Sequence, residues 1–486
     1  MAIEMKRIGK KSFFFLAAAC MASVIMGCDY NQQTAQSHQA FEQGNLEAAA
    51  QSMHEQATKS LTDDKDHDKL LLNLEDGALQ RAAGHLDTSV QALDHADEIY
   101  SVFEVGPNVR ISQEAAATAI NDTIKDYTGY AYDGIMLNTY KALDALELGD
   151  MDRTRAELNH ASQRQTDAAA KYAKEIADAQ KNQPDQQSGQ QDQFDVDAAK
   201  KDPQFQQQFN QDYADLNVQD LSAYADFVNP FTEYVHGLFL VYAGVDSSDA
   251  EKGATTMRRV AGLVKGNPYV AQDAVTADKI ANGAQPTPTT YVIYEAGEAP
   301  ERGQIKIRFP LILRNRDGGG QLIEAAFPTL EKRPSDAEQV NVQAGGANYP
   351  TAVVCNMDDV IEQEFKIELP GVIARAMISA AVKAISQYAI DKAGANSNNA
   401  FANALLHVAS GAFVEASTQA DRRTWKSLPK LFSVASLPTP ADRNITIAFP
   451  NGAVTPVHLQ DGVINVVFVK EISGGIPPII RQTKLK

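Results

Sequence analysis

Residues 140–164 read YKALDALELGDMDRTRAELNHASQR, two runs of helical composition joined by a short turn. Gly149-Asp150 supplies the turn, because glycine and aspartate interrupt helices and favour tight reversals. Met151 follows the turn glycine by two positions and Leu158 follows seven residues later, so both lie on one face of the second helix. The stretch therefore predicts a helical hairpin.

The same arrangement occurs twice more, in residues 35–57 and 74–100. Their turn glycines and the apolar pairs that follow are Gly44 with Leu46 and Met53, and Gly84 with Leu86 and Leu93. A fourth helical pair is expected from Pro230 to Lys265. The turn and packing positions resemble those of tetratricopeptide (TPR) repeats, although the spacing is uneven and the aromatic-rich first helix is missing. We expect residues 35–283 to form an α-helical layer of degenerate TPR-like hairpins.

Two polar segments accompany this layer. Residues 28–36 are rich in glutamine and predict a flexible tether. Residues 181–211 combine glutamine and aspartate with few apolar side chains. Such a composition buries too little apolar surface to offset the entropy lost on ordering. We expect a solvated insertion at residues 181–211 rather than a binding site.

After Pro288 the helical period gives way to the alternation of strands. Residues 305–309 alternate apolar with basic side chains, and three glycines separate them from residues 322–327, which predicts a β-hairpin. Further strands are expected at 339–344, 349–355, 431–437, 444–449 and 463–469, and helices at 358–393, broken at Pro370, and at 400–419. Residues 288–486 thus predict a mixed α+β domain, a sheet backed by a helical hairpin, in a multidomain chain.

The N-terminus has the features of a bacterial lipoprotein precursor. Four basic residues precede an uncharged, mostly apolar run from Phe13 to Met26 that is too short to span a membrane. The sequence Ile25-Met26-Gly27-Cys28 then resembles a lipobox, where a signal peptide is removed and the cysteine is acylated. We expect residues 1–27 to be a signal peptide and Cys28 to carry the lipid. An ordinary secretory signal cleaved near Ala19, or acylation of Cys20, are the alternatives.

The lipid on Cys28 would attach the protein to a cell membrane, facing the periplasm. Asp29 resembles the residue that retains lipoproteins in the inner membrane of enteric bacteria, but Tyr30 does not strengthen that signal. The sequence leaves open whether the inner or the outer membrane holds the protein.

The composition limits the partners of the protein. The formal charge is −18 at pH 7, and it becomes −21 without residues 1–27, which hold four basic residues and one acidic residue. A strongly acidic protein repels phosphate backbones and anionic headgroups. We therefore expect no nucleic-acid partner. Cys355 is the only thiol that remains once Cys28 is acylated and Cys20 is removed, so no internal disulfide is expected.

No motif in the sequence predicts a cofactor, a metal site or a catalytic residue. The G-x-S-x-G elbow and the phosphate-binding Gly-Lys-Ser/Thr loop are both missing. Asp64, Asp66, Asp68 and Glu75 have the spacing of an EF-hand loop, but Lys69 stands where that loop requires glycine. We interpret the acidic run as the start of a helix, where carboxylates are favoured by the helix dipole.

The segment DRRTWKSLPK, residues 421–430, is the most distinctive candidate for binding a partner. It surrounds the only tryptophan, Trp425, with the cations Arg422, Arg423 and Lys426, which are suited to binding a carboxylate or a phosphate. The alternative is an aromatic plug between a helix and a strand, with one arginine paired to a nearby acid.

Four motifs resemble the landmarks of a family of uncharacterised bacterial lipoproteins with a helical-repeat front half. They are YEAGEAPER (294–302), EFKIELPGVIARA (364–376), NPF (229–231) and DRRTWKSLP (421–429). The resemblance implies a location in the cell envelope and a helical front half, and it transfers no catalytic residue.

Two functions agree with these features. The favoured one is a non-enzymatic, membrane-anchored scaffold or adaptor that binds another envelope protein or a secreted polymer. The alternative is an envelope enzyme that acts on glycan or peptide in a cleft between the two domains. Its carboxylate pair would be Glu295 and Glu298, or Asp358 and Asp359.

Overall fold

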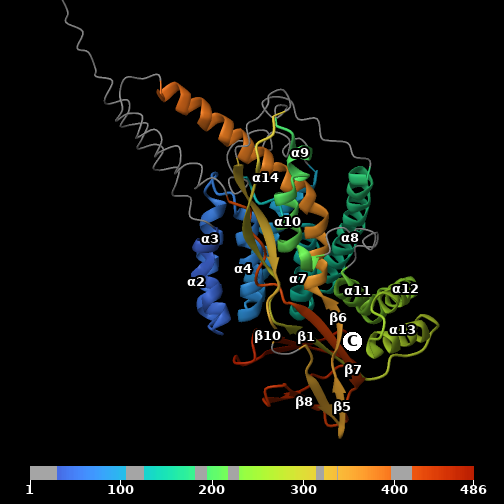
Figure 1. The fold of residues 1–486 in the computed structure, drawn as a ribbon. Coiled ribbons are helices and arrows are strands. Elements are labelled where there is room, and N and C mark those ends of the chain that lie inside the picture. The colour runs from blue at the N-terminus through green and yellow to red at the C-terminus, as the bar shows by residue number, and fades with distance from the viewer. Residues whose placement is uncertain are drawn as a thin grey trace, which may run out of the picture.

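The computed structural model describes residues 30–105, 125–180, 194–216, 229–313, 322–335, 338–395 and 419–486. Within these ranges the expected order is confirmed, because helices α2 to α13 all precede the first strand, β1 (Thr289–Ala296) (Figure 1). The predicted signal peptide, Cys28 and most of the helix predicted at 400–419 lie outside the described residues.

Antiparallel helical hairpins make up the first half of the fold. Their helices are α2 (Tyr30–Glu42) with α3 (Leu46–Leu61), α4 (Lys69–Ala83) with α5 (Leu86–Val105), α7 (Ala131–Leu148) with α8 (Met151–Gln180), and α11 (Pro230–Ala243) with α12 (Ser247–Leu263). The three predicted turn glycines have left-handed φ angles of 75°, 88° and 82°. Met53, Leu93 and Leu158 are fully buried. The sequence therefore located these hairpins correctly, and α13 (Pro268–Ala281) follows the last of them.

The segment predicted to be a tether is helical from Tyr30 onward. Tyr30, Thr34, Ser37 and Phe41 recur at helical spacing along α2 and are buried. The glutamines that suggested a flexible segment lie between these positions. A narrow buried stripe is enough to hold a polar helix on the body of the protein.

The glutamine-rich insertion is also more ordered than predicted. Residues 181–193 lie outside the described part, but α9 (Val196–Lys200) and α10 (Pro203–Asp212) are helices, followed by a single 3-10 turn (Ala214–Leu216). Phe205 and Phe209 stack on each other, and Phe205 also contacts Phe309 and Phe327 of the neighbouring hairpin. A few aromatic residues at helical spacing outweigh the polar composition, because each buries a large apolar area.

Two β-sheets, a larger mixed sheet and a smaller antiparallel sheet, pack face to face below the helices. The larger sheet has the strand order β11-β10-β1-β7-β6, formed by β11 (Ile479–Lys484), β10 (Ile464–Glu471), β1, β7 (Leu431–Pro438) and β6 (Ala352–Asn356). The smaller has the order β5-β4-β8-β9, formed by β5 (Ala347–Pro350), β4 (Asn341–Ala344), β8 (Asn444–Ala448) and β9 (Val454–His458). Strands β1, β9 and β11 are not among the strands expected from the sequence, and the single strand expected at 349–355 is divided between β5 and β6.

The central strand β1 shows how the layers are arranged. Tyr291 and Ile293 join the core beneath the helices, whereas Val292 and Tyr294 join the core between the two sheets. Alternate residues of a strand point to opposite faces, so the large sheet lies between the helical layer and the small sheet. The large sheet is therefore covered by the front-half helices on one face and by the small sheet on the other. Most of the second helix of the hairpin predicted behind it, 400–419, lies outside the described residues.

The predicted β-hairpin is confirmed as β2 (Glu301–Pro310) and β3 (Leu322–Glu331), which pair antiparallel. The long helix α14 (Met357–Ala395) packs against β3 and continues through Pro370, where the sequence predicted a break. Leu369 and Ile373 flank the exposed proline and are buried against the hairpin, so packing keeps the helix continuous despite the lost hydrogen bond. Among the described helices, none is long and apolar enough to cross a membrane.

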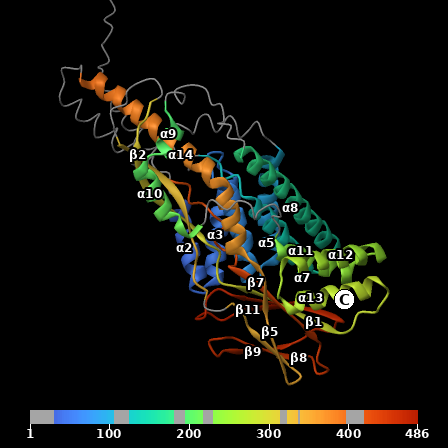
Figure 2. The same ribbon diagram turned by 45° about the vertical axis from the view of Figure 1, so that its right-hand side comes forward.

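The predicted boundary near residue 288 separates kinds of secondary structure but does not separate cores. One hydrophobic cluster contains Leu143 of α7, Val235 of α11, Ile293 of β1 and Phe468 of β10. Figures 1 and 2 show the helices standing on the large sheet from both viewing angles. The two halves therefore share their main core.

Candidate functional site

Residues 419–430, which we call the tryptophan loop, lead into β7. Trp425 is 0% exposed and meets Tyr140 of α7 edge-on, with 5.9 Å between ring centroids. Its indole Nε1 donates a hydrogen bond to Ser427 Oγ at 3.0 Å. The ring thus fills the space between the helical layer and the start of β7, with its one polar atom satisfied inside the loop.

Arg423 of the tryptophan loop is 4% exposed and is paired within the chain. Its guanidinium donates to Asp68 Oδ1 at 2.9 Å and to Asp421 Oδ2 at 2.7 Å, and it lies over the Tyr127 ring. Burial alone raises the pKa of Asp421, but the adjacent Arg423 outweighs this and lowers it. The loop is thereby fixed to the start of α4 through a charge pair that solvent scarcely reaches.

Glu75, in the middle of α4, binds the backbone amides of the tryptophan loop. Its carboxylate accepts hydrogen bonds from the amides of Lys426 at 2.7 Å and Ser427 at 3.3 Å, and from the Tyr30 hydroxyl at 3.3 Å. The Nε2 atom of His38 lies 3.6 Å from the same carboxylate. One buried acid therefore joins α2, α4 and the tryptophan loop.

A second buried acid, Glu364 of α14, joins α14 to the start of α7. It accepts hydrogen bonds from the backbone amides of Ala131 at 2.7 Å and Tyr132 at 3.2 Å, which are the first residues of α7. A carboxylate at this position meets both the free amides and the positive end of the helix dipole. Arg302 lies over the ring of Tyr130, 4.0 Å from its centroid.

The four landmark motifs meet in this region. We call it the interlock, and it comprises the tryptophan loop together with Asp68, Glu75, Tyr130, Arg302 and Glu364. Glu364, Arg302 and Trp425 belong to three of the motifs, and Phe231 of the NPF motif stacks on Phe432 of β7, 3.7 Å between centroids. Asn229 begins α11 by accepting from the amides of Phe231 and Thr232. Motifs far apart in sequence thus meet where the helical layer joins α14 and the large sheet.

The residues predicted to bind a partner have the geometry of the alternative, an aromatic plug with a paired arginine. Trp425 and Arg423 are buried, and the Lys426 ammonium lies 3.4 Å from Glu301. Arg422 is half-buried and also interacts within the chain. The contacts seen for this set are therefore internal to the interlock.

The carboxylates proposed for the enzyme alternative are each engaged by neighbouring groups. Glu295 accepts from the Tyr140 hydroxyl at 3.2 Å and from Lys470 at 3.3 Å, and Glu298 lies 2.5 Å from Arg333. Burial raises the pKa of Glu298 to about 7, whereas nearby cations, Lys470 foremost, outweigh burial and lower the pKa of Glu295.

The other proposed pair is divided between the interior and the surface. Asp358 is buried and pairs with Lys430, whereas Asp359 is exposed. The structure therefore does not present Asp358 and Asp359 to one space as equivalent carboxylates.

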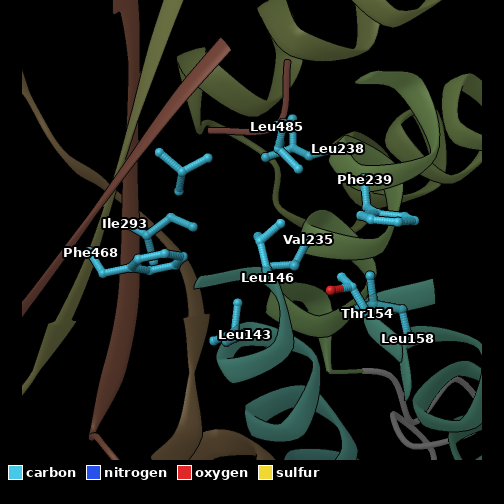
Figure 3. A pocket seen from close by; sticks show the side chains of 11 residues that line it. Leu143, Leu146, Thr154, Leu158, Val235, Leu238, Phe239, Ile293, Phe468 and Leu485 are labelled. Atoms are coloured by element: carbon cyan, nitrogen blue, oxygen red, sulfur yellow. The ribbon is translucent and has the colours of Figure 1, made fainter. Parts of the chain in front are cut away.

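A small cavity of about 10 Å³ lies between α7, α8, α11 and the large sheet (Figure 3). Aliphatic and aromatic side chains, among them Leu146, Leu238 and Phe468, form its wall, with the hydroxyl of Thr154 as the polar exception. A cavity of this size and polarity is a packing defect in the core, not a substrate site. Neither carboxylate pair lines it.

Metal chemistry finds no support in the part of the chain that the structure describes. No group of three His, Cys, Asp or Glu side chains there is placed to hold an ion. Asp68 and Glu75 of the EF-hand-like spacing are used by the interlock instead. His236 is buried in α11, and burial lowers its pKa to about 4.

Sequence reasoning missed Glu75, Glu364 and Arg302 as the charged members of the interlock. A local signal existed only for Glu75, which follows the largely apolar run LLLNL, whereas Glu364 lies among other charged residues in the stretch EQEFKIE. A charge in such a run is seldom fully buried unless it is paired. In comparisons with known proteins, the chain matches no family model, no curated protein and no solved structure.

Proposed function

We propose that this protein is a lipid-anchored envelope scaffold, attached to a membrane through Cys28 and facing the periplasm. On this proposal the hairpins form a TPR-like layer that, with the sheets, offers surfaces to another envelope protein or to a secreted polymer. The family resemblance of the four landmark motifs supports the same location.

The short link between Cys28 and the folded body carries the proposal. Tyr30, only two residues after Cys28, is buried at the start of α2. Two residues of extended chain reach about 7 Å, so a lipid on Cys28 would hold the body close to the membrane surface. Each buried methylene contributes about 0.8 kcal/mol, and two or more acyl chains make such attachment stable.

The polar interior also favours a scaffold. Arg423, Glu75 and Glu364 of the interlock are paired with carboxylates or backbone amides of the same chain. The buried Arg302 guanidinium lies over the Tyr130 ring instead, and its Nε and Nη2 atoms have no hydrogen-bond partner among the described residues. Stacked hairpins supply extended binding surfaces without any catalytic group.

Replacement of Cys28 tests the anchor. We expect Cys28→Ser to leave the membrane fraction, either as a soluble protein or as an unprocessed precursor, because acylation needs the thiol. Cys20→Ser is the matched control and should remain membrane-bound with the acylated N-terminus detectable by mass spectrometry. A processed Cys28→Ser protein that stays in the membrane pellet contradicts the proposal. Cross-linking before extraction of the wild type then identifies the protein partners.

The envelope-enzyme alternative rests on the opposite pKa shifts of Glu295 and Glu298, since acid and base catalysis by two carboxylates needs such a difference. Turnover of glycan or peptide substrates that is lost in Glu298→Gln, with folding unchanged, would favour it over the scaffold.

A further inference from the structure

The outer face of the small sheet carries no charged side chain. The register of β5, β4, β8 and β9 assigns ten positions to the face opposite the inter-sheet core: Asn341, Gln343, Asn348, Pro350, Asn444, Thr446, Ala448, Val454, Pro456 and His458. Asp, Glu, Lys and Arg occupy none of these positions, although they make up 22% of the chain. Charged residues adjoin this face at its rim, where Asp442 accepts from the Asn444 amide and Arg443 pairs with Asp461.

This face is exposed to solvent, and the opposite face of the same sheet packs in a buried core. Gln343, Asn348, Asn444 and His458 are exposed. The side chains between them, such as Val342, Ile445 and Ile447, are buried in the core that joins the two sheets. Figures 1 and 2 place β5 and β8 at the end of the molecule farthest from α9. The face thus carries four amides, one hydroxyl and one imidazole, interspersed with the four apolar side chains of Pro350, Ala448, Val454 and Pro456.

The chemistry of these side chains selects a class of partner. An amide offers two donors and one carbonyl acceptor, and a hydroxyl offers both, which matches the mixed donors and acceptors of sugar hydroxyls. Anionic polymers and membranes are bound through Lys and Arg, which this face lacks. Protein interfaces are enriched in aromatic residues, Met and Arg, and the ten positions include none of these.

We propose that the outer face of the small sheet binds an uncharged polysaccharide chain. Gln343, Thr446 and the interacting pair Asn444 and His458, 3.0 Å apart, supply its hydrogen bonds. Val454 and Pro456 give apolar contact to the sugar rings. This inference rests on the proposed scaffold function and names the secreted polymer that the scaffold would hold.

The test uses the full lipidated chain in detergent, run on native gels that contain a polysaccharide. The uncharged probes are dextran, laminarin and soluble starch, and polygalacturonate is the anionic probe. The variant is Gln343→Glu, and its matched control is Gln272→Glu on the exposed surface of α13, which adds the same charge with the same change of shape. Thermal melting of both variants verifies that folding is unchanged.

We expect at least one uncharged glucan to retard the wild type and polygalacturonate not to do so. Gln343→Glu should weaken the binding about fivefold or more, because one amide hydrogen-bonding site is lost, and Gln272→Glu should bind as the wild type does. Retardation by none of the uncharged probes, equal binding by the two variants, or stronger binding to polygalacturonate overturns the proposal. So does a protein partner whose cross-linking is lost in Gln343→Glu. Release of Cys28→Ser from the membrane bears on the anchor alone, so the two proposals fail separately.

Discussion

Truncation of Trp425 tests whether the tryptophan loop fastens the two halves of the fold together. The ring is 0% exposed and lies against Tyr140. A buried tryptophan removes about 200 Å² from water, which at about 25 cal/mol per Å² corresponds to about 5 kcal/mol. Partial relaxation around the cavity lowers this figure, and measured losses for Trp→Ala are about 3–5 kcal/mol. We expect Trp425→Ala to lose about 4 kcal/mol of unfolding free energy.

The assay is urea unfolding of the soluble Cys28→Ser form, followed by far-ultraviolet circular dichroism because Trp425 is the only tryptophan. Val454→Ala is the control, since Val454 is 62% exposed and its truncation should change the free energy by less than about 0.5 kcal/mol. If Trp425→Ala does not fold, Trp425→Phe keeps most of the apolar volume and should lose less. A loss below about 1 kcal/mol for Trp425→Ala, with an unchanged dependence on urea, refutes the plug.

Two further predictions concern helix packing and pH. Gly77→Ala should lower the free energy of unfolding by about 1–3 kcal/mol, because a Cβ there would meet the Leu93 side chain at 2.4 Å. Gly262→Ala is the control, since a Cβ there would have no atom within 4 Å, and it should leave the stability unchanged or raise it. Equal shifts of the melting temperature in the two variants would contradict this. Burial raises the pKa of Asp133 to about 7, above about 3.9 in the unfolded chain, so its stabilising contribution is complete below about pH 4 and is lost as the pH rises through 7. In Asp133→Asn the free energy of unfolding should therefore decline less between about pH 4 and pH 7, which urea unfolding at several pH values measures. If the variant and the wild type lose the same free energy over this range, Asp133 is not the cause of the decline.

Local patterns in the sequence determined most of the secondary structure. The turn glycines Gly44, Gly84 and Gly149 were identified because left-handed backbone angles are a property of single residues. The hairpin of β2 and β3 was likewise identified from alternation over a few residues. The first signal is a single residue and the second lies within residues 305–327, so no tertiary contact is needed to recognise either of them.

The tertiary structure decided what happens where local signals conflict with packing. Residues 30–36 and α10 have polar compositions, yet a few buried aromatic residues order them, and α14 passes through Pro370 because both sides of it are buried. The interlock also depends on tertiary structure alone, since Glu75 and Lys426 are 351 residues apart in the chain. A charge in an apolar run signals that some partner exists, but which backbone amides satisfy it depends on long-range packing that no local pattern encodes.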